Sequence, residues 1–254
     1  MRVERLESDV LAVLSTMEVE GTRARITKGS LERKLYERTN KALELLGGKW
    51  NKSARAHVFA DDPTAALDGA ILTGQIARAR DVLGFFPTPP ALAHEVVRKA
   101  DIRPGMRVLE PSAGDGAIAR EIPADCERVL VEIDAGRVAR LRAGGEGNLI
   151  VLGEFLGQSA ATLGTFDRVV MNPPFAGQQD IDHVTHAFGF LRPGGRLVAI
   201  MAAGVLFREN RKAVEFRALV DAADGTIEEN DEGAFKVSGT GVRTVTVTMD
   251  RKAA

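Results

Sequence analysis

Asn172 is followed by Pro173, Pro174 and Phe175, directly after DRVVM, an apolar run that is typical of a buried strand. Proline has no N–H to donate to a sheet, so two prolines in succession predict that the strand ends at Met171. The next residues then form a stiff loop at the carboxyl end of that strand. Open α/β sheets bind their ligands at this edge. An amide and an aromatic ring held there by prolines therefore predict a ligand-binding loop.

A second candidate loop, EPSAGDGAIAR, follows a predicted strand at residues 107–110. The glycines on either side of Asp115 allow a sharp turn and a close approach of a ligand to the backbone. A dinucleotide fingerprint would need a third glycine where this chain has Ala119. Carboxylates at Glu110 and Asp115 would repel phosphates and favour a cation. The loop therefore predicts a ligand that lacks a pyrophosphate.

Further acids follow the next two predicted strands. Glu132 ends the run VEID and lies 22 residues after Glu110, close to the spacing of ~20 residues at which an acid reaches ribose hydroxyls. Glu154 and Phe155 follow the third strand and are expected at the same edge. The ligand indicated is a nucleoside without phosphates that carries a positive or zwitterionic tail.

Together these loops resemble those of the class I S-adenosylmethionine-dependent methyltransferases, and within them the amino-methylating DNA adenine methyltransferases of the gamma arrangement. In that family a Thr-Pro box precedes the glycine loop, as FFPTPP at residues 85–90 does here, and an Asn-Pro-Pro-aromatic box comes third, as NPPF does. The similarity covers residues 85–250. It departs at Glu154, where the family usually has Asp before Phe-Leu, and in the absence of a long C-terminal target-recognition domain.

The resemblance implies S-adenosylmethionine as cofactor, no metal, and methyl transfer to the N6 amine of an adenine flipped out of DNA. In the family mechanism the Asn172 side-chain carbonyl and the Pro173 backbone carbonyl accept the two N–H bonds of the amine, and Phe175 stacks on the base. The catalytic residues implied are Asn172, Pro173, Pro174 and Phe175. The cofactor-binding residues implied are Thr88, Pro89, Glu110, Pro111, Ser112, Ala113, Gly114, Asp115, Gly116, Glu132, Ile133, Glu154, Phe155 and Asn172.

The Thr-Pro box is expected to start a helix, with Thr88 as its N-cap and a proline at the first helical position. The free N–H groups of that helix would then face the methionine carboxylate of the cofactor. Residues 206–210, LFREN, follow the fifth strand and are expected to form a mobile lip over the base pocket.

Several alternatives stay open. Similar Asn-Pro-Pro loops occur in RNA adenine methyltransferases and in protein glutamine methyltransferases, because a glutamine amide presents the same planar –NH₂. A nucleic-acid-binding module with a vestigial cofactor fold is a further alternative. The segment DIDHVTH at residues 180–186 could hold a metal, although a helix after the NPPF loop explains it better. Methylation of a pyrimidine ring carbon would need a cysteine in that loop, and the single cysteine, Cys126, lies elsewhere.

The elements that would position these loops follow from the pattern after residue 85. Short β-branched runs alternate with helical segments, and the last run, RTVTVTMD, alternates strictly as an antiparallel strand does. This pattern predicts an α/β fold with a doubly wound, mostly parallel seven-stranded sheet, the Rossmann-like methyltransferase fold. We assign residues 81–254 to this domain.

Residues 1–80 are expected to form a small N-terminal extension of helices and a hairpin. The spacing of leucines predicts a helix over residues 29–46 with Ser30 as N-cap. KWNKSARAHVF, which contains Trp50, predicts a hairpin, and DDPTAALDGAILTGQIARAR predicts a second helix.

The charge of the chain is unevenly distributed. Residues 22–58 carry ten Lys and Arg against three acids, a net charge of +7. Because the whole chain has a net charge of −1, the rest of the chain has a net charge of −8. This indicates a polyanion contact through residues such as Lys49, Lys52 and Arg55, with a solvated helix face as the alternative. DNA is therefore the expected partner, with RNA or protein possible. The oligomeric state stays open.

The remaining composition is that of a soluble protein. No apolar run approaches the ~18 residues of a membrane span, and the N-terminus has no signal-like apolar core. A single cysteine allows no internal disulfide. We expect a cytoplasmic protein, and the resemblance implies a bacterial or phage-encoded one.

Overall fold

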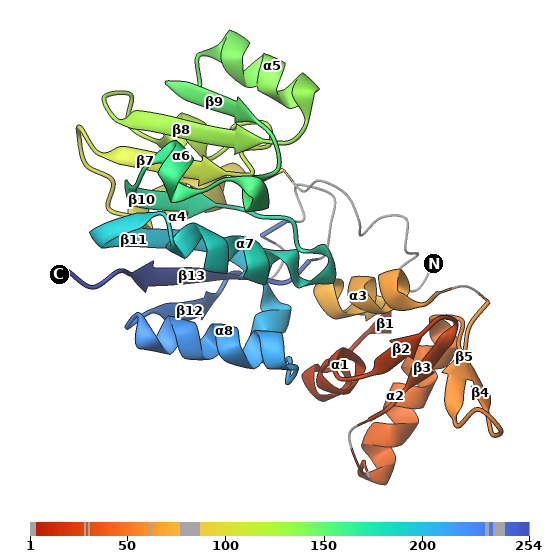
Figure 1. Cartoon of the computed structure of the whole chain (residues 1–254). Coiled ribbons are helices and arrows are strands. Elements are labelled where there is room, and N and C mark those ends of the chain that lie inside the picture. Colours follow the sequence, from red (N-terminus) through yellow and green to blue (C-terminus); the bar gives the residue numbers. More distant parts are fainter. Residues whose placement is uncertain are drawn as a thin grey trace.

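The computed structural model describes residues 4–27, 29, 31–60, 62–76, 87–231, 234–235 and 242–253. Figure 1 shows a smaller N-terminal part and a larger part that contains the main sheet. Ser30, Phe85, Phe86 and the expected boundary at residue 80 lie outside the described residues.

The larger part is built on a seven-stranded sheet with the order β12-β13-β11-β10-β7-β8-β9. The pairs β9–β8, β8–β7, β7–β10 and β10–β11 are parallel, whereas β13 runs antiparallel to both β11 and β12. This confirms the predicted mostly parallel sheet and its antiparallel strand near the C-terminus. The strands are β7 (Arg107–Pro111), β8 (Glu127–Glu132), β9 (Leu149–Leu152), β10 (Phe166–Met171), β11 (Leu191–Ala202), β12 (Thr226–Glu229) and β13 (Thr244–Asp250).

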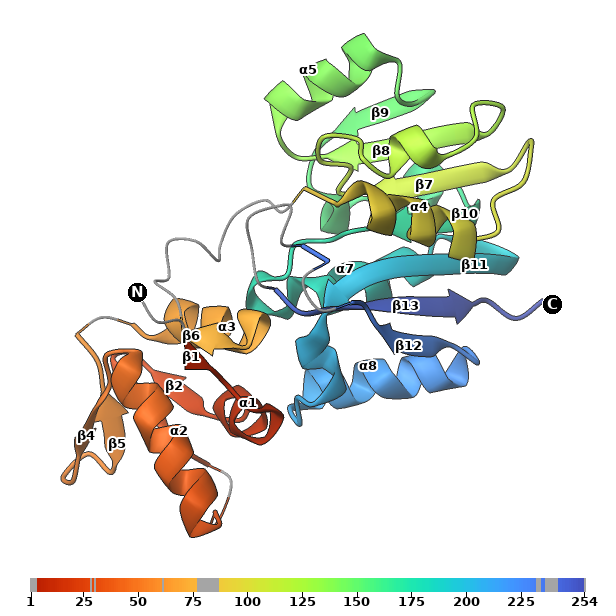
Figure 2. The ribbon, with the colours of Figure 1, turned by 180° about the vertical axis from the view of Figure 1, so that it is seen from behind.

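Helices cover both faces of the sheet, as Figures 1 and 2 show from opposite sides. Successive strand residues point to opposite faces, so in β10 Val169 and Met171 enter one core and Val170 enters the other. The strands are therefore continuously apolar, as a doubly covered parallel sheet requires. The helices are α4 (Pro90–Lys99) and α5 (Ala135–Gly144) on one face, and α6 (Ala160–Leu163), α7 (Gln179–Phe188) and α8 (Arg211–Ala222) on the other.

The described residues of the N-terminal part form three helices, a four-stranded antiparallel sheet with the order β2-β3-β5-β4, and a β1–β6 pair. The predicted hairpin is present as β4–β5, with Trp50 opposite His57. The second predicted helix ends at Thr73, because Gly74 adopts a left-handed conformation with φ 64°. The elements are β1 (Glu4–Arg5), α1 (Ser8–Ser15), β2 (Glu18–Glu20), β3 (Arg23–Arg25), α2 (Arg33–Leu45), β4 (Lys49–Asn51), β5 (Ala56–Val58), α3 (Thr64–Thr73) and β6 (Gln75–Ile76).

The two parts meet through α3. This helix contacts the short 3₁₀ turns η4 (Ala176–Gln178) and η5 (Ala203–Leu206), which follow β10 and β11. Leu72 of α3 belongs to the same buried cluster as Phe175, and Phe207 packs against the N-terminal core. The segment 206–210 is thus anchored between the two parts, contrary to the expected mobile lip, because its apolar and cationic side chains are drawn into that contact.

Candidate functional site

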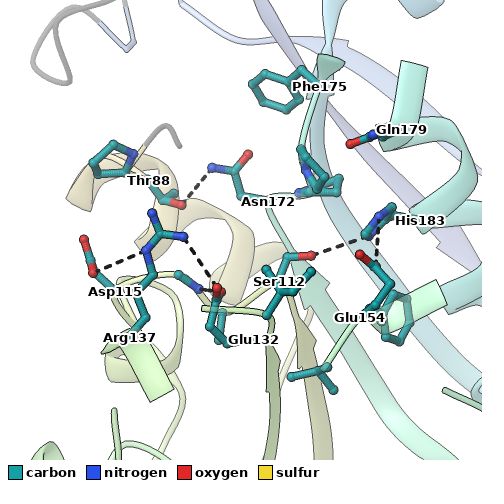
Figure 3. Close-up of a pocket in the computed structure, with 18 of the residues that line it drawn as sticks. Thr88, Ser112, Asp115, Glu132, Arg137, Glu154, Asn172, Phe175, Gln179 and His183 are labelled. Atoms are coloured by element: carbon teal, nitrogen blue, oxygen red, sulfur yellow. Dashed lines mark hydrogen bonds and ion pairs between the residues drawn. The ribbon is translucent and has the colours of Figure 1, made fainter. Parts of the chain in front are cut away.

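A cavity of about 440 Å³ opens at the carboxyl ends of the parallel strands (Figure 3). Its size suits a small ligand. Most of the predicted site residues line it, from all four loops that the sequence singled out. They are Thr88, Ser112, Ala113, Gly114, Asp115, Glu132, Ile133, Glu154, Phe155, Asn172, Pro173, Pro174 and Phe175.

Glu132 joins the second strand to the glycine loop. Its Oε2 accepts the backbone N–H of Gly114 at 2.7 Å, and its Oε1 accepts the N–H of Asp134 at 2.9 Å. Arg137 Nη1 lies 3.5 Å from the same Oε1. The side chain is only 4% exposed, so the carboxylate is held in one position at the cavity wall. It therefore fixes the shape of the glycine loop as well as offering oxygens to a ligand.

Asn172 and Thr88 connect the two boxes that the sequence places far apart. Asn172 Nδ2 donates a hydrogen bond to Thr88 Oγ1 at 3.0 Å across 84 residues of sequence. In Figure 3 the amide nitrogen points to Thr88 and the amide oxygen points away from it. The N-cap of α4 is Pro89, with Pro90 first in the helix. Thr88 is therefore not the cap that we expected, because its hydroxyl holds the asparagine instead.

Phe175 is a wall of the cavity rather than an open platform. Its ring is 3% exposed and meets Phe235 edge-on, with ring centroids 6.3 Å apart and an interplanar angle of 80°. The expected exposed face for a flipped base is thus not present in this structure. The reason is long-range packing, since Phe235 comes from a segment 60 residues later in the chain.

Four predicted cofactor residues lie outside the cavity lining: Pro89, Glu110, Pro111 and Gly116. Glu110 follows Leu109 in β7 and so points to the opposite face of the sheet, beneath the glycine loop. Its burial there raises the pKa of the carboxyl well above its usual value. Among the described residues Glu110 Oε2 has no hydrogen-bond partner. The predicted contact of Glu110 with a cation in the cavity is therefore wrong.

Gly116, Pro111 and Pro89 have structural positions close to the site. Gly116 has φ 78°, and an added Cβ would lie 2.7 Å from a methyl group of Leu141. Only glycine fits this turn of the loop. Pro111 is the last residue of β7, and Pro89 caps α4. These residues shape the loops without facing the ligand space.

Sequence reasoning missed three polar residues of the cavity wall: Arg137, Gln179 and His183. Gln179 and His183 are one turn apart on α7, so both face the cavity. His183 Nε2 lies 3.8 Å from Glu154 Oε1, and its Nδ1 lies 3.5 Å from Ser112 Oγ. Burial lowers the pKa of His183, which favours the neutral imidazole. The four-residue spacing directly after the NPPF loop was the available signal.

The charges of the cavity suit a cationic ligand. Three acids line it, Asp115, Glu132 and Glu154, against Arg137, which lies beside Glu132 and within 4.0 Å of Asp115. The wall therefore keeps an acidic excess, which disfavours phosphates and favours a positive or zwitterionic group. These residues fit a nucleoside with a charged tail, as the sequence predicted.

The acids of DIDHVTH are used within the protein. Asp180 Oδ2 accepts the N–H of Ala202 at 3.0 Å, and Asp182 is paired with Lys212. Within the ranges that the structure describes, no group of three or more His, Cys, Asp or Glu side chains is arranged to hold a metal ion. None of the helices described is long and apolar enough to cross a membrane.

A buried charge network ties the NPPF loop to the N-terminal part. The carboxylate of Asp68 in α3 interacts with the backbone N–H of Gly177, two residues after Phe175. Arg208 is 4% exposed and lies 4.0 Å from Asp68, and it also interacts with Asp180. The Arg208 guanidinium therefore lies near two carboxylates, Asp68 of α3 and Asp180 of α7.

We expect Asp68→Ala to loosen the loop that carries the site. Loss of the Gly177 acceptor leaves a backbone donor unpaired, which costs about 1–3 kcal/mol. Hydrogen exchange of residues 175–180 should then speed up about 10-fold, whereas exchange at the Glu132–Gly114 contact should not change. Asp68→Asn, which keeps an acceptor, is the control and should exchange more slowly than Asp68→Ala. Equal exchange in all three proteins would refute the anchoring role.

Asp180 makes stability depend on pH. Burial raises its pKa from 3.8 to about 6, so the folded state binds the proton more tightly than the unfolded state between these values. Stability from this group is complete below pH 4 and is lost as pH rises toward 6, by up to about 3 kcal/mol. Urea unfolding at pH 4–7 should show a flatter dependence for Asp180→Asn than for the wild type. Parallel curves would contradict this assignment.

Known proteins share this architecture. No protein-family model matches the chain. A curated tRNA (guanine(6)-N2)-methyltransferase of Thermus thermophilus is 30% identical over 136 residues, 47% of this chain and 41% of that protein. The chain thus spans about two fifths of the length of that relative.

Two solved structures are similar in fold at low sequence identity. A type I restriction-modification methyltransferase subunit from Streptococcus thermophilus superposes with a TM-score of 0.56 at 18% identity, over 74% of this chain and 48% of that chain. A dimethyladenosine transferase from Plasmodium falciparum gives a TM-score of 0.50 at 16% identity, over 66% and 64% of the two chains. The chain has the Rossmann-like methyltransferase fold. Likeness at this identity shows the fold alone.

Proposed function

We propose that this protein transfers a methyl group from S-adenosylmethionine to the exocyclic N6 amine of adenine in DNA. The observation that carries the proposal is the hydrogen bond from Asn172 Nδ2 to Thr88 Oγ1 at the wall of an acidic cavity. This bond turns the amide nitrogen toward Thr88, and in this proposal the amide oxygen, on the other side of the group, accepts a hydrogen bond from the amine of the substrate. The Thr-Pro and Asn-Pro-Pro boxes therefore act as one unit.

The acidic half of the cavity holds the cofactor in this proposal. Glu132 accepts the ribose hydroxyls, Ile133 and Phe155 provide apolar contacts for the adenine, and Glu154 and His183 offer polar groups to its edge. The glycine loop lets the methionine tail approach the backbone, and the acidic wall suits its ammonium group. When bound, the cofactor supplies a methyl group that is attached to a positively charged sulfur. The sulfur keeps the electron pair of the broken S–C bond.

The NPPF half holds the amine. An exocyclic amine is a weak nucleophile, because its lone pair is delocalised into the ring. Acceptors at Asn172 Oδ1 and the Pro173 carbonyl would hold both N–H bonds and localise that lone pair toward the methyl group. The prolines fix these acceptors beforehand, which is electrostatic preorganisation. Pro174 and Phe175 form the apolar wall. The amine releases one proton to water as the new N–C bond forms.

A second candidate is methylation of a base amine in RNA. It is favoured by the similarity to a tRNA (guanine(6)-N2)-methyltransferase, the highest sequence identity among the proteins compared above. The loop offers the same acceptors to any planar amine, including a guanine N2 amine or a glutamine amide. The proposed mechanism is therefore common to these substrates, and only the substrate differs.

The test is transfer of labelled methyl from S-adenosylmethionine to unmethylated duplex DNA, total RNA and a protein extract in parallel, followed by digestion and mass spectrometry. We expect N6-methyladenine in DNA. Label in RNA or protein would keep the mechanism and overturn the DNA substrate. Cofactor binding with no label in any pool would favour a binding module and contradict the proposed enzyme.

A further inference from the structure

We propose that the β4–β5 hairpin is a DNA contact in which Trp50 stacks on an unstacked base while Lys49, Lys52 and Arg55 bind the phosphates around it. This inference rests on the proposed function, since it names how the enzyme holds its substrate outside the cavity.

The hairpin lies on the outside of the N-terminal part. Its strand β4 is the edge of the sheet, and all three residues of β4 are exposed. In both ribbon views the hairpin is at the outer end of this part, away from the main sheet (Figures 1 and 2). The part as a whole is fixed beside the cavity, because α3 contacts the turn that follows the NPPF loop. The hairpin and the cavity therefore belong to two parts of the chain that are in direct contact.

The hairpin is entirely cationic. Lys49, Lys52 and Arg55 are the charged residues of the sequence from 45 to 60, which has no acid. In the part of the chain that the structure describes, these three side chains form no ion pair, whereas Arg33 and Arg38 of α2 pair with nearby acids. Several cations on one loop without ion-pair partners are typical of a surface that binds a polyanion.

Trp50 adds an aromatic surface at the centre of these charges. Its side chain is 49% exposed, and its ring lies 5.2 Å from the His57 ring. His57 is buried and fixed by a 2.7 Å hydrogen bond from its Nε2 to Asn40 Oδ1. The indole is thus supported on one side by a fixed ring and open to solvent on the other. Such a ring is a stacking platform for a base.

Charge selects DNA over a second copy of this chain. An exposed edge strand can pair with another copy, but three like charges on the hairpin would repel each other across that pairing. A DNA strand is instead attracted to these cations, and each phosphate contact releases counterions, which favours binding. RNA and acidic vesicles are the other anionic candidates, and the test below includes both.

Trp50 is the only tryptophan of the chain, so the tryptophan fluorescence of the protein reports on this residue alone. Titration of the full protein with a fluorescently silent single-stranded or duplex DNA should quench its emission and protect it from acrylamide. Anisotropy with labelled DNA then gives affinity. We expect Trp50→Ala to weaken binding about 10-fold, with Trp50→Phe close to wild type. Binding by anisotropy without any change in tryptophan emission would overturn the stacking role.

The phosphate contacts of Lys52 and Arg55 can be tested separately through the salt dependence of DNA binding. The double variant Lys52→Gln/Arg55→Gln should lower the slope of log affinity against log salt by about 2, whereas Trp50→Ala should leave that slope unchanged. Arg211→Gln is the matched control, since Arg211 is an exposed cation on α8 that pairs with Glu215. Equal slopes in the double variant and the control would refute the phosphate contacts. Tighter binding to RNA of the same sequence, or to anionic vesicles, would overturn the DNA assignment.

Kinetics separate this inference from the proposed function. The hairpin does not line the cavity, so its variants should raise KM for DNA and leave kcat and cofactor affinity unchanged. Methyl transfer with unchanged KM in the hairpin variants would refute the hairpin contact and keep the enzyme. Hairpin-dependent DNA binding with no transfer by the wild type would refute the enzyme and keep the contact.

Discussion

Asn172→Ala is expected to lower kcat for methyl transfer by about 10²–10³-fold, with the affinity for S-adenosylmethionine changed less than a few-fold. The amide oxygen is the acceptor proposed to localise the lone pair of the amine, and removal of one preorganised polar group at a reacting centre has costs of this size. The cofactor contacts at Glu132 and the glycine loop do not depend on this side chain. Single-turnover transfer at saturating cofactor measures the effect.

Thr88→Val is the matched variant for this prediction. Valine has nearly the same shape but cannot accept the 3.0 Å hydrogen bond from Asn172 Nδ2. The asparagine is then present but free to rotate, so we expect a smaller loss in kcat of about 10-fold. If Asn172→Ala weakened S-adenosylmethionine binding and left kcat at saturating cofactor unchanged, the acceptor role would be contradicted.

Glu132→Ala is expected to raise the Kd for S-adenosylmethionine by about 10–100-fold. The substitution removes the proposed ribose acceptor and also leaves the N–H groups of Gly114 and Asp134 without their carboxylate. Hydrogen bonds to a charged group contribute about 1.5–3 kcal/mol each, which converts to this range. The glycine loop should loosen at the same time, since Glu132 Oε2 is its tie to β8.

Glu132→Gln serves as the control, because it keeps an acceptor oxygen and the volume of the side chain. We expect an intermediate Kd, and isothermal titration distinguishes the three proteins. Arg137 lies beside Glu132 Oε1, so Glu132→Gln also removes a charge pair. The double variant Glu132→Gln/Arg137→Gln tests whether the loss of this pair explains the change in Kd. Wild-type affinity in Glu132→Ala would show that the cofactor does not use this carboxylate.

The sheet and most of the cavity wall were predictable, because strand endings can be recognised locally. The prolines after Met171 and the glycines around Asp115 end their strands, and the carboxyl ends of parallel strands meet at one edge. Glu132 was placed correctly by its distance from the first loop. These signals depend only on residues close together in sequence.

Glu110 and Phe175 show where local reasoning stops. Glu110 sits one residue after Leu109, and the two-residue period of a strand turns it away from the cavity. The alternation of strand residues predicts this orientation, whereas proximity to the glycine loop does not. The burial of Phe175 could not have been inferred, since it depends on contact with Phe235 far along the chain.

The N-terminal part was predictable only in outline. The helix predicted over residues 29–46 and the hairpin are both present. The helix spans Arg33–Leu45 with Glu32 at its N-cap, so the predicted start and the predicted cap at Ser30 were too early. Strands β2 and β3 are only three residues long, so their alternation is too short to indicate a strand. The contact of Asp68 with Gly177 and Arg208 joins segments more than 100 residues apart, and no local pattern points to it.

Titration of the wild-type protein with S-adenosylmethionine, beside NAD and ATP, tests the central claim most directly. We expect one molecule of S-adenosylmethionine to bind per chain in isothermal titration, and NAD and ATP to bind far more weakly, because the acidic cavity wall repels their phosphates. Saturable binding of NAD or ATP with no heat from S-adenosylmethionine would contradict the proposed cofactor and the methyl transfer derived from it.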